Sequence, residues 1–400
     1  MNQLRVCKLI RRHSFLDVRV CRKQARSLAA MGHDVTIMAP RMNGALLDVN
    51  RQPLPRSNYG GEHFDLDGIH IRTYRARHIV PNLRAMLETL RGHHYGHVPD
   101  GLFAAALDVS ADVYHAHEPE TLYEAVLIKR KLAEEGRSVK VVFDAHELEA
   151  DTTVLRQLML EADHLITVSR PIATIYAKRH PHIPISLIYN SPEWVSEEEL
   201  GIGRGAADRG EIPFVIGYEG MITKAKGNPA KIKAVMDRLS DEGLNIRFKV
   251  LGKVQMVKRG EQKEWENFLR NDPRFDYGWV NFDSLTEQWK DVDAGYIYFD
   301  LSTSNRHYAL PNKFFSLLNS GVPVVVNAAA AMGAVVREHQ CGIVLPGRNP
   351  SSSEYAEAFK QLYGNPEQLA EMGRNAREAI RTTFGWQEME KRLGDIYAGL

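Results

Sequence analysis

Residues 310–326 have the sequence LPNKFFSLLNSGVPVVV, and this stretch decides the fold. Proline near the start of an apolar run favours the first turn of a helix. Gly321 and Pro323 then mark a turn, and the valines that follow predict a buried strand. From Phe314 the sequence runs without charge to Val336, which is long enough for a membrane span. Because Asn319, Gly321 and Pro323 interrupt it, we predict a helix, a turn and a buried strand instead.

Outward from this stretch, short β-rich runs alternate with helical patterns along all 400 residues. This alternation is typical of parallel α/β sheets, and a chain of this length suits two domains. Helical patterns include residues 20–31, capped by Gly32, as well as residues 121–135 and 353–400. The predicted strands are residues 6–10, 34–39, 70–74, 112–115, 140–144, 164–168, 185–189, 214–218, 247–251, 275–277, 295–299, 322–326 and 342–345.

A break in this pattern sets the domain boundaries. Residues 191–211 are first acidic and then glycine-rich, which predicts a linker. We therefore expect an N-terminal Rossmann-like domain over residues 1–190 and a C-terminal one over residues 212–384. The last helix, residues 385–400, is expected to pack back on the N-terminal domain. Open parallel sheets bind ligands beyond the carboxyl ends of their strands, so the residues after each strand are the ones to inspect.

The charge pattern excludes one class of partner and suggests another. A net charge of +1 gives the whole chain no nucleic-acid signature. Residues 1–91, however, hold 16 Lys/Arg and 7 Asp/Glu, whereas residues 92–200 hold 9 and 18. The basic first segment could meet an anionic acceptor or a membrane surface, or it is an ordinary solvated face. The residues that could make such contacts are Arg72, Arg75, Arg77, Arg84 and Arg91, with Leu87 and Leu90 on one helix with the last two.

The cysteines and the N-terminus favour a cytoplasmic protein. Cys7, Cys21 and Cys341 have no metal-ligand spacing, and such a sparse, odd set suggests reduced thiols. Lys8 and Arg11 interrupt any apolar core at the N-terminus, which argues against a signal peptide.

Three strand ends in the first half carry candidate residues. His13 and Arg19 follow the first strand, where a helix start could hold an anion or a polar acceptor, whereas Asp17 could act there or cap the helix. His115 and His117 end a later strand on one face, where an imidazole could bond a sugar hydroxyl. A His–X–His pair can also bind metal, but no third ligand is evident. The next strand ends in His146 and Glu147, which could line the same site or cap a helix.

The second half offers residues suited to phosphate. Glycine lets the backbone approach a ligand and lysine supplies charge, while the helix starting near Pro311 could hold a diphosphate on its amides. Each of these features also has an ordinary structural interpretation as a loop or a loop–helix junction. The candidate donor-binding residues are Gly220, Lys224, Lys226, Gly252, Trp279, Val280, Ser304, Asn305, Pro311, Asn312, Lys313 and Ser316.

Taken together, these motifs resemble retaining glycosyltransferases of the GT-B fold, in the large family 4 group. The resemblance runs along nearly the whole chain and rests on the order and spacing of short pieces. Those pieces are residues 17–20 (DVRV), 27–35, 115–117 (HAH), 143–147 (FDAHE), 188–191 (IYNS), 226–227, the block from 311 to 323, and 384–386 (FGW).

The resemblance implies an α/β protein of GT-B architecture, with two Rossmann-like domains whose parallel sheets face a central cleft. A nucleotide-sugar would bind the second domain and an acceptor the first, and a hexose-type sugar would pass to an acceptor hydroxyl with retention of configuration. The acceptor would be a glycan, a lipid-linked molecule or a small molecule, and contact with the inner face of a membrane through the basic segment is possible. The resemblance implies no metal and no cofactor besides the donor.

Two departures from the family's pattern keep alternatives open. The family has two glutamates in this last block, whereas this chain has Tyr308 and Ser316, and Met221 stands where the family has arginine. A sugar-nucleotide 2-epimerase shares the fold and is one alternative; the DVRV opening and the late PNK block favour a transferase. An inactive nucleotide-sugar-binding partner subunit is the other alternative, and the missing glutamates motivate it.

Overall fold

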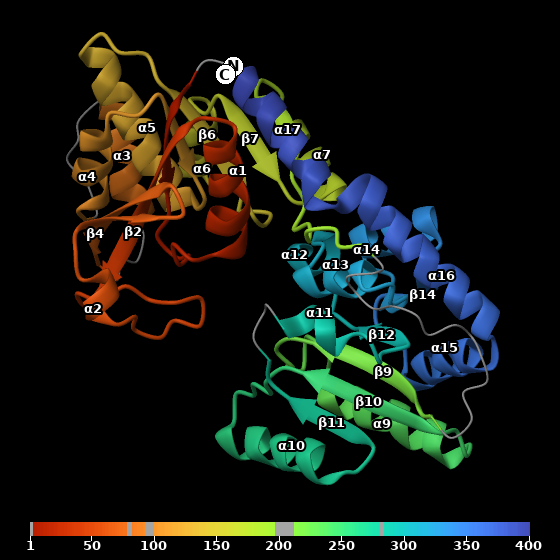
Figure 1. Cartoon of the computed structure of the whole chain (residues 1–400). Coiled ribbons are helices and arrows are strands. Elements are labelled where there is room, and N and C mark those ends of the chain that lie inside the picture. The colour runs from red at the N-terminus through yellow and green to blue at the C-terminus, as the bar shows by residue number, and fades with distance from the viewer. Residues whose placement is uncertain (1–2, 78–81, 93–99, 197–211, 281–283) are drawn as a thin grey trace. The chain divides into compact units, whose positions relative to one another are not determined.

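The computed structural model describes residues 3–77, 82–92, 100–196, 212–280 and 284–400. The chain divides into two compact units (Figure 1). Unit 1 comprises Met1–Tyr189 together with Met389–Leu400, and unit 2 comprises Asn190–Glu388. Each unit contains one sheet of its own. The predicted linker at residues 191–211 falls largely on residues 197–211, which lie outside the described residues.

Unit 1 is built on an eight-stranded sheet with the order β3-β4-β2-β1-β5-β6-β7-β8. All neighbouring strands pair in parallel except β3, which pairs antiparallel with β4. The strands are β1 (Arg5–Leu9), β2 (Asp34–Met42), β3 (His63–Leu66), β4 (Ile69–Ala76), β5 (Val113–Ala116), β6 (Lys140–Ala145), β7 (His164–Thr167) and β8 (Ile185–Leu187).

Helices connect most of the parallel strands of this sheet (Figure 1). The chain returns to unit 1 from Met389 onward, within α17 (Trp386–Ala398), where Met389 and Leu393 are fully buried. The other helices of unit 1 are the π-helix η1 (Val18–Ala25), α1 (Arg26–Ala30), α2 (Arg56–Tyr59), α3 (Leu83–Gly92), α4 (Leu102–Val109), α5 (Pro119–Glu134), α6 (Thr153–Met159) and α7 (Arg170–Arg179).

Unit 2 contains a six-stranded, all-parallel sheet with the order β11-β10-β9-β12-β13-β14. Its strands are β9 (Phe214–Glu219), β10 (Ile246–Leu251), β11 (Phe275–Gly278), β12 (Ala294–Ile297), β13 (Val324–Asn327) and β14 (Gly342–Leu345). Its helices are α9 (Pro229–Asp241), α10 (Arg259–Asn271), α11 (Leu285–Gln288), α12 (Ser304–Tyr308), α13 (Asn312–Asn319), α14 (Ala330–His339), α15 (Ser352–Gly364), α16 (Pro366–Ala379) and η3 (Ile380–Phe384).

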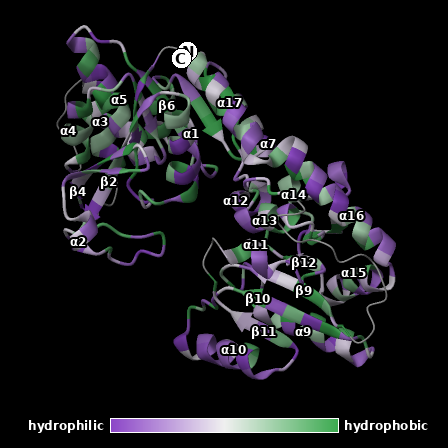
Figure 2. Ribbon diagram, in the orientation of Figure 1, coloured by the Kyte–Doolittle hydropathy of each residue, from purple (hydrophilic) through white to green (hydrophobic). Residues whose placement is uncertain are grey.

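The expected α/β class with two parallel sheets is confirmed, and the uncharged stretch at residues 314–336 is helix, turn, strand and helix as predicted. Apolar residues gather on the strands, whereas outer helices such as α10 are largely hydrophilic (Figure 2). Among the described residues, no helix combines the length and the apolar character needed to cross a bilayer.

Three local features differ from the sequence expectations. The antiparallel strand β3 was missed, although Asp67 and Gly68 between β3 and β4 both have positive φ, as an Asp-Gly hairpin turn requires. The expected helix at residues 20–31 begins as the π-helix η1 and only then becomes α1. The helical pattern at residues 353–400 is broken, because new helices begin after Asn365 and Gly385.

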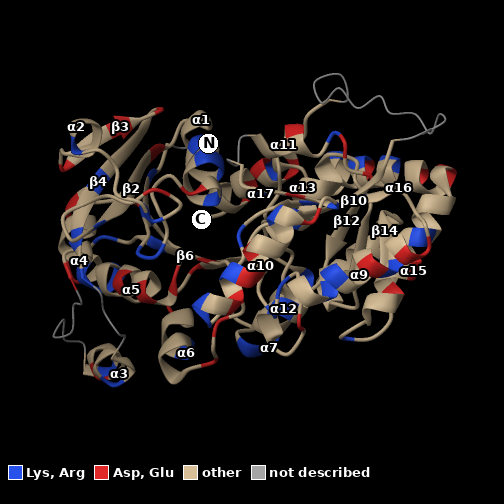
Figure 3. Ribbon diagram, turned by 90° about the horizontal axis from the view of Figure 1, so that it is seen from below, with Lys and Arg blue, Asp and Glu red and all other residues tan. Residues whose placement is uncertain are grey.

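Several arginines of the basic first segment are paired with carboxylates inside unit 1. Arg5 and Arg11 pair with Asp112 at 3.0 Å and Glu124 at 2.8 Å, carboxylates from the acidic second segment. Arg72 pairs in the same way with Asp108. Basic residues of the first segment therefore pair with acidic residues of the second segment within unit 1. In unit 2, outer helices such as α9 and α15 carry both basic and acidic side chains (Figure 3).

The helix that was predicted to lie on a membrane turns one of its leucines inward. Residues 83–92 do form helix α3, but Leu90 is 4% exposed and packs inside unit 1. Arg84 on its outer side pairs with Glu88 at 2.9 Å. Leu83 of the same helix is 47% exposed, and binding of this helix to a bilayer stays a prediction.

Candidate active site

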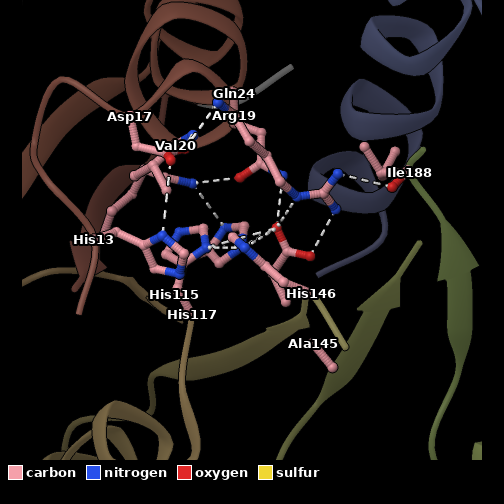
Figure 4. Close-up of polar contacts among 12 residues, drawn as sticks. His13, Asp17, Arg19, Val20, Gln24, His115, His117, Ala145, His146 and Ile188 are labelled. Carbon is pink, nitrogen blue, oxygen red and sulfur yellow. Dashed lines mark hydrogen bonds and ion pairs between the residues drawn. The ribbon is translucent and has the colours of Figure 1, made fainter. Parts of the chain in front are cut away.

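The carboxyl ends of β1, β5 and β6 lie next to one another, because these strands are consecutive in the sheet. The segment after β1 carries His13, β5 is followed by His117, and β6 is followed by His146. The ring of His146 lies 4.7 Å from that of His13 and 5.2 Å from that of His117, measured between centroids (Figure 4). The structure thus gathers histidines from three of the predicted strand ends.

Asp144, near the end of β6, organises the contacts around these rings. Its carboxylate accepts hydrogen bonds from Arg19 Nε at 2.9 Å, Arg19 Nη2 at 2.7 Å and Gln24 Nε2 at 2.7 Å. Burial alone would raise the pKa of Asp144, but the charge and the hydrogen bonds of its neighbours, Arg19 foremost, hold that pKa well below its usual value. Asp144 is therefore a permanently ionised anchor.

Arg19 is occupied inside unit 1, which corrects its expected role as an acceptor ligand. Besides its bonds to Asp144, its Nη1 donates to the carbonyl oxygens of Ile188 at 2.9 Å and Tyr189 at 3.1 Å. The side chain is 8% exposed. Its charge stabilises the carboxylate rather than a bound substrate.

The π-helix η1 explains how two of its residues reach one carboxylate. In a π-helix the backbone bonds connect residues five apart, so residues i and i+5 lie nearly in line. Arg19 and Gln24 are five residues apart, and both donate to Asp144 (Figure 4). Single turns of π-helix occur often at functional sites, and here the wider turn directs both donors to one point.

His115 and His117 form a neutral, buried stack next to Asp144. Their rings are 4.6 Å apart and nearly parallel, at 11°. Burial, reinforced by the charge of Lys8, holds the pKa of both imidazoles well below the usual value, so both are neutral at physiological pH. His117 Nδ1 lies 3.0 Å from His146 Nε2, and Nε2 of His117 is buried with no hydrogen-bond partner among the described residues.

His13 and His146 are the members of the cluster that reach solvent. Their side chains are 28% and 19% exposed, whereas those of His115 and His117 are wholly buried. His13 also faces two carboxylates, Asp17 at 3.7 Å and Glu118 at 3.7 Å. Burial lowers the pKa of His13, but the hydrogen bond with Asp17 and the charges of both carboxylates outweigh this and raise it.

Two further residues complete the cluster from the opposite side of His115. Lys8 and His115 are register partners on neighbouring strands, and Lys8 Nζ lies 3.4 Å from His115 Nδ1 and 2.8 Å from Gln24 Oε1. The hydroxyl of Tyr397, on α17, lies 2.8 Å from the same Nδ1. Both contacts are made to Nδ1, whereas Nε2 of His115 lies 4.0 Å from Asp144.

Asp144 supplies the third metal ligand that the sequence did not reveal, but the charges around it do not suit a cation. One ligand atom from each of His115, His117 and Asp144 lies within 4.8 Å of the others. However, Arg19 already occupies both oxygens of Asp144, and Lys8 adds a second positive charge beside His115. A divalent ion would meet two cationic side chains in a buried space, so the cluster fits such an ion poorly.

Asp17 and Glu147 have local roles. Asp17 caps η1 by accepting from the backbone N–H of Arg19 at 2.9 Å and of Val20 at 3.0 Å. This is the capping alternative considered for it, although its second oxygen still faces His13. Glu147 is exposed on the loop after β6.

In unit 2, the start of α13 has the properties of an anion site. Pro311 precedes the helix, and no side chain caps its first amides. Lys313, in the first turn, places Nζ 3.8 Å from the centre of the Tyr218 ring and close to Gly220. Burial lowers the pKa of Lys313. Unsatisfied amides at the positive end of a helix dipole, next to a lysine, bind phosphate readily.

A carboxylate stands beside Ser316, the position where the family resemblance implies glutamate. Glu219, at the end of β9, accepts a hydrogen bond from Ser316 and faces Lys313; burial raises its pKa, which Lys313 and Ser316 partly oppose. Ser316 Oγ in turn accepts from Trp289 Nε1 at 3.0 Å. Within the described part of the chain, Glu219 Oε2 has no hydrogen-bond partner.

The other predicted donor residues of unit 2 differ in their surroundings. Lys226 is exposed and close enough to Lys313 to affect its charge, whereas Lys224 is paired with Glu261 at 2.8 Å. Gly252 serves packing, because a Cβ there would lie 1.9 Å from the carbonyl oxygen of Gly220. The remaining candidates lie on the loop after β11 and on or at the start of helices α12 and α13: Trp279, Val280, Ser304, Asn305 and Asn312.

Comparison with known proteins identifies the first unit. Residues 18–191 match the family model described as Glycosyltransferase Family 4. Unit 1 carries a Glycosyltransferase Family 4 domain. Among curated proteins, spore coat protein SA of Bacillus subtilis (strain 168) is 22% identical over 58% of this chain and 64% of its own length. The D-inositol 3-phosphate glycosyltransferase of Streptomyces bingchenggensis is 31% identical over 20% of this chain and 16% of its own. The chain thus spans less than two thirds of these relatives.

Solved structures confirm the fold outside the Family 4 domain as well. Sucrose-phosphate synthase from Thermosynechococcus elongatus covers 99% of this chain and 98% of its own, with a TM-score of 0.68 at 13% identity. Anabaena HepE, in a structure with UDP and glucose, covers 100% of both chains with a TM-score of 0.67 at 13% identity. These matches confirm the expected GT-B fold class. Sequence identities of 13% are evidence for the fold alone.

Several site residues escaped the sequence reasoning. Lys8 on β1 was detectable in principle, since a charged residue inside an apolar strand is rarely buried without a partner. Gln24 required knowledge of the π-helix, because α-helical spacing would direct it away from Arg19. Tyr397 is 282 positions from His115 and carries no local signal. Glu219 was not selected, because the prediction at this strand end rested on the next residue, Gly220, as a place where the backbone approaches a ligand.

Proposed function

We propose that the protein transfers a hexose-type sugar from a nucleotide diphosphate-sugar to an acceptor hydroxyl, with retention of configuration and without a metal. Unit 2 binds the donor and unit 1, with its Family 4 domain, binds the acceptor. The observation that carries this proposal is the histidine cluster at the ends of β1, β5 and β6. It is anchored by an ionised aspartate, and its buried neutral imidazoles support two rings that reach solvent and can bond sugar hydroxyls.

In unit 1, the exposed rings are the ones that contact sugar. His146 touches a hydroxyl of the transferred sugar or of the acceptor, and His13 lies beside it. His117 keeps its predicted place in the site in a modified role, because it holds His146 through the 3.0 Å contact. His115 stacks on the ring of His117 and is itself held by contacts with Tyr397 and Lys8. Asp17 and Glu147 stay at the rim of this site, where Asp17 sets the charge of His13.

In unit 2, the donor phosphates rest on the start of α13. The uncapped amides, Lys313 and the exposed Lys226 neutralise the charge of the diphosphate as it departs. Glu219 supplies a carboxylate beside Ser316 that can accept from the nucleotide. The structure of HepE with UDP and glucose makes UDP the first nucleotide to test.

The donor half of this proposal is tested by calorimetry with UDP, GDP and ADP. Lys226→Ala should weaken binding of the preferred nucleotide roughly 10- to 100-fold, as expected for the loss of a charge-assisted hydrogen bond. Lys224→Ala is the matched control, because Lys224 is paired with Glu261. Unchanged affinity in Lys226→Ala would remove this residue from the donor site, and no binding of any nucleotide would overturn the function.

The catalytic half is tested by release of the nucleotide from its sugar in the presence of acceptors. His146→Ala and His117→Ala should each lower turnover about 100-fold, the scale of a positioned proton-transfer group, and leave nucleotide affinity unchanged. His70→Ala is the control, because His70 starts β4 at the opposite edge of the same sheet and is exposed. Nucleotide binding with no turnover across a broad acceptor set would instead indicate an inactive binding subunit.

A further inference from the structure

A small basic cavity opens at the carboxyl ends of β2 and β4 in unit 1. It has a volume of about 300 Å³, and its lining includes Arg41, Arg56 and Arg75 with the single carboxylate Glu62. Arg41 and Arg75 are register partners on the paired strands, so both side chains leave the sheet on the same face. Arg56 comes from α2 on a separate segment. Three guanidinium groups against one carboxylate leave the cavity with an excess of two positive charges.

Internal contacts leave these charges uncompensated. The Arg41 guanidinium donates to Thr73 Oγ1 at 3.0 Å and to the carbonyl oxygens of Tyr59 at 2.7 Å and Gly61 at 2.6 Å, all of them neutral acceptors. Within the described residues, Arg56 and Arg75 have neither an ion pair nor a side-chain hydrogen bond. This sets them apart from Arg5, Arg11 and Arg72, whose charges carboxylates of unit 1 neutralise.

The cavity lies along the same edge of the sheet as the histidine cluster and is tied to it. Tyr74, which lines the cavity, donates from its hydroxyl to the carbonyl oxygen of Ile10 at 2.9 Å, at the end of β1. Ser14, one residue after His13, donates to the carbonyl oxygen of Leu47 at 2.7 Å, on the loop between β2 and α2. In the order β4-β2-β1-β5, the cavity is two to three strands from His117, or roughly 10–15 Å at the usual strand spacing.

We infer that this cavity binds a phosphate group of the acceptor, held by Arg41, Arg56 and Arg75, while the acceptor hydroxyl lies at the histidine cluster. Guanidinium groups match phosphate oxygens in geometry and remain charged at every physiological pH. The volume suits a phosphate ester with part of its sugar and is too small for a lipid chain as well. The inference rests on the proposed function and adds the chemical class of its acceptor.

The test uses the full chain with saturating UDP, so that the donor site is filled and any further anion binds elsewhere. Inorganic phosphate should bind in calorimetry, and Arg56→Gln and Arg75→Gln should each weaken this binding at least about 10-fold. Arg84→Gln is the matched control: it removes the same charge from unit 1, but Arg84 lies on α3 and pairs with Glu88. All variants should bind UDP with unchanged affinity.

Two arms separate the sources of the phosphate. A soluble sugar phosphate that binds in an Arg75-dependent manner indicates a free acceptor. Arg75-dependent binding only to neutral vesicles that contain a sugar linked to a polyprenyl diphosphate indicates a lipid-linked one, and either result supports the inference. Phosphate affinity that is equal in Arg56→Gln, Arg75→Gln and Arg84→Gln would overturn it, even if UDP binds. Failure of UDP to bind would instead count against the proposed function.

Discussion

Replacing Ser316 with glutamate restores the residue that the family resemblance implies, yet we expect it to harm this protein. The new carboxylate would lie beside Glu219, which is half-buried and already faces Lys313. Two carboxylates about 4 Å apart repel by ~4 kcal/mol at an effective dielectric constant of 20, and the one lysine offsets part of this. The substitution also removes the hydrogen bond from Trp289 to Ser316, worth ~1 kcal/mol.

Ser316→Gln provides the matched control, because glutamine has the same shape as glutamate without its charge. At pH 8 we expect the glutamate variant to be less stable than the glutamine variant by about 2–4 kcal/mol in urea unfolding. The repulsion raises the folded pKa of the new carboxyl above its unfolded value of about 4.3. Its cost is therefore absent below pH 4, grows as the pH rises, and is complete above the raised pKa.

Nucleotide binding gives the second measurement. Calorimetry should show that UDP binds at least about 10-fold more weakly to Ser316→Glu than to the wild type, because the added carboxylate stands unpaired where a donor would approach. A gain in UDP affinity would refute the idea that Glu219 has taken over the place of the missing glutamate. Equal stability of the two variants at pH 8 would refute the proposed repulsion.

Two further predictions concern the buried cluster of unit 1. Burial lowers the pKa of Lys8 to about 7, below the ordinary value of 10.5; the unfolded chain therefore holds more protons between these values, and wild-type stability should rise from pH 7 to pH 10. Lys8→Met should show a clearly smaller rise in urea unfolding, and an identical rise would contradict the assignment. Tyr397→Phe should cost about 1 kcal/mol of stability and lower turnover several-fold without changing UDP affinity; a weaker UDP affinity would point to a general loss of structure.

Sequence patterns predicted the sheets well because their signal is local. Buried parallel strands are continuous apolar runs, and residues 322–326 and 140–144 stand out for this reason. The antiparallel strand β3 was harder, because its sequence HFDL is short and half polar. The π-helix η1 was beyond such patterns, since the same residues also satisfy α-helical spacing and only the tertiary contacts of Arg19 and Gln24 distinguish the two.

The site was predictable where its residues follow strands and not where they meet through packing. His13, His117 and His146 could be grouped because parallel strands end at one edge. Arg19 was assigned to a substrate because a sequence shows its charge but not the carboxylate that binds it. The basic balance of residues 1–91 was open for the same reason: the carboxylates that pair with Arg5, Arg11 and Arg72 lie more than 30 positions away in the sequence.

The contact between Tyr397 and His115 has a consequence for how the protein is made. A ribosome synthesises the strands and histidines of unit 1 first, then all of residues 190–388, and only afterwards the segment of α17 that supplies Tyr397. The buried His115 therefore lacks its hydroxyl partner throughout the synthesis of unit 2. Domains generally fold as they emerge, with the N-terminal one first. Here the first unit to emerge is the last to be completed, so translation arrest within unit 2 should leave an open histidine cluster.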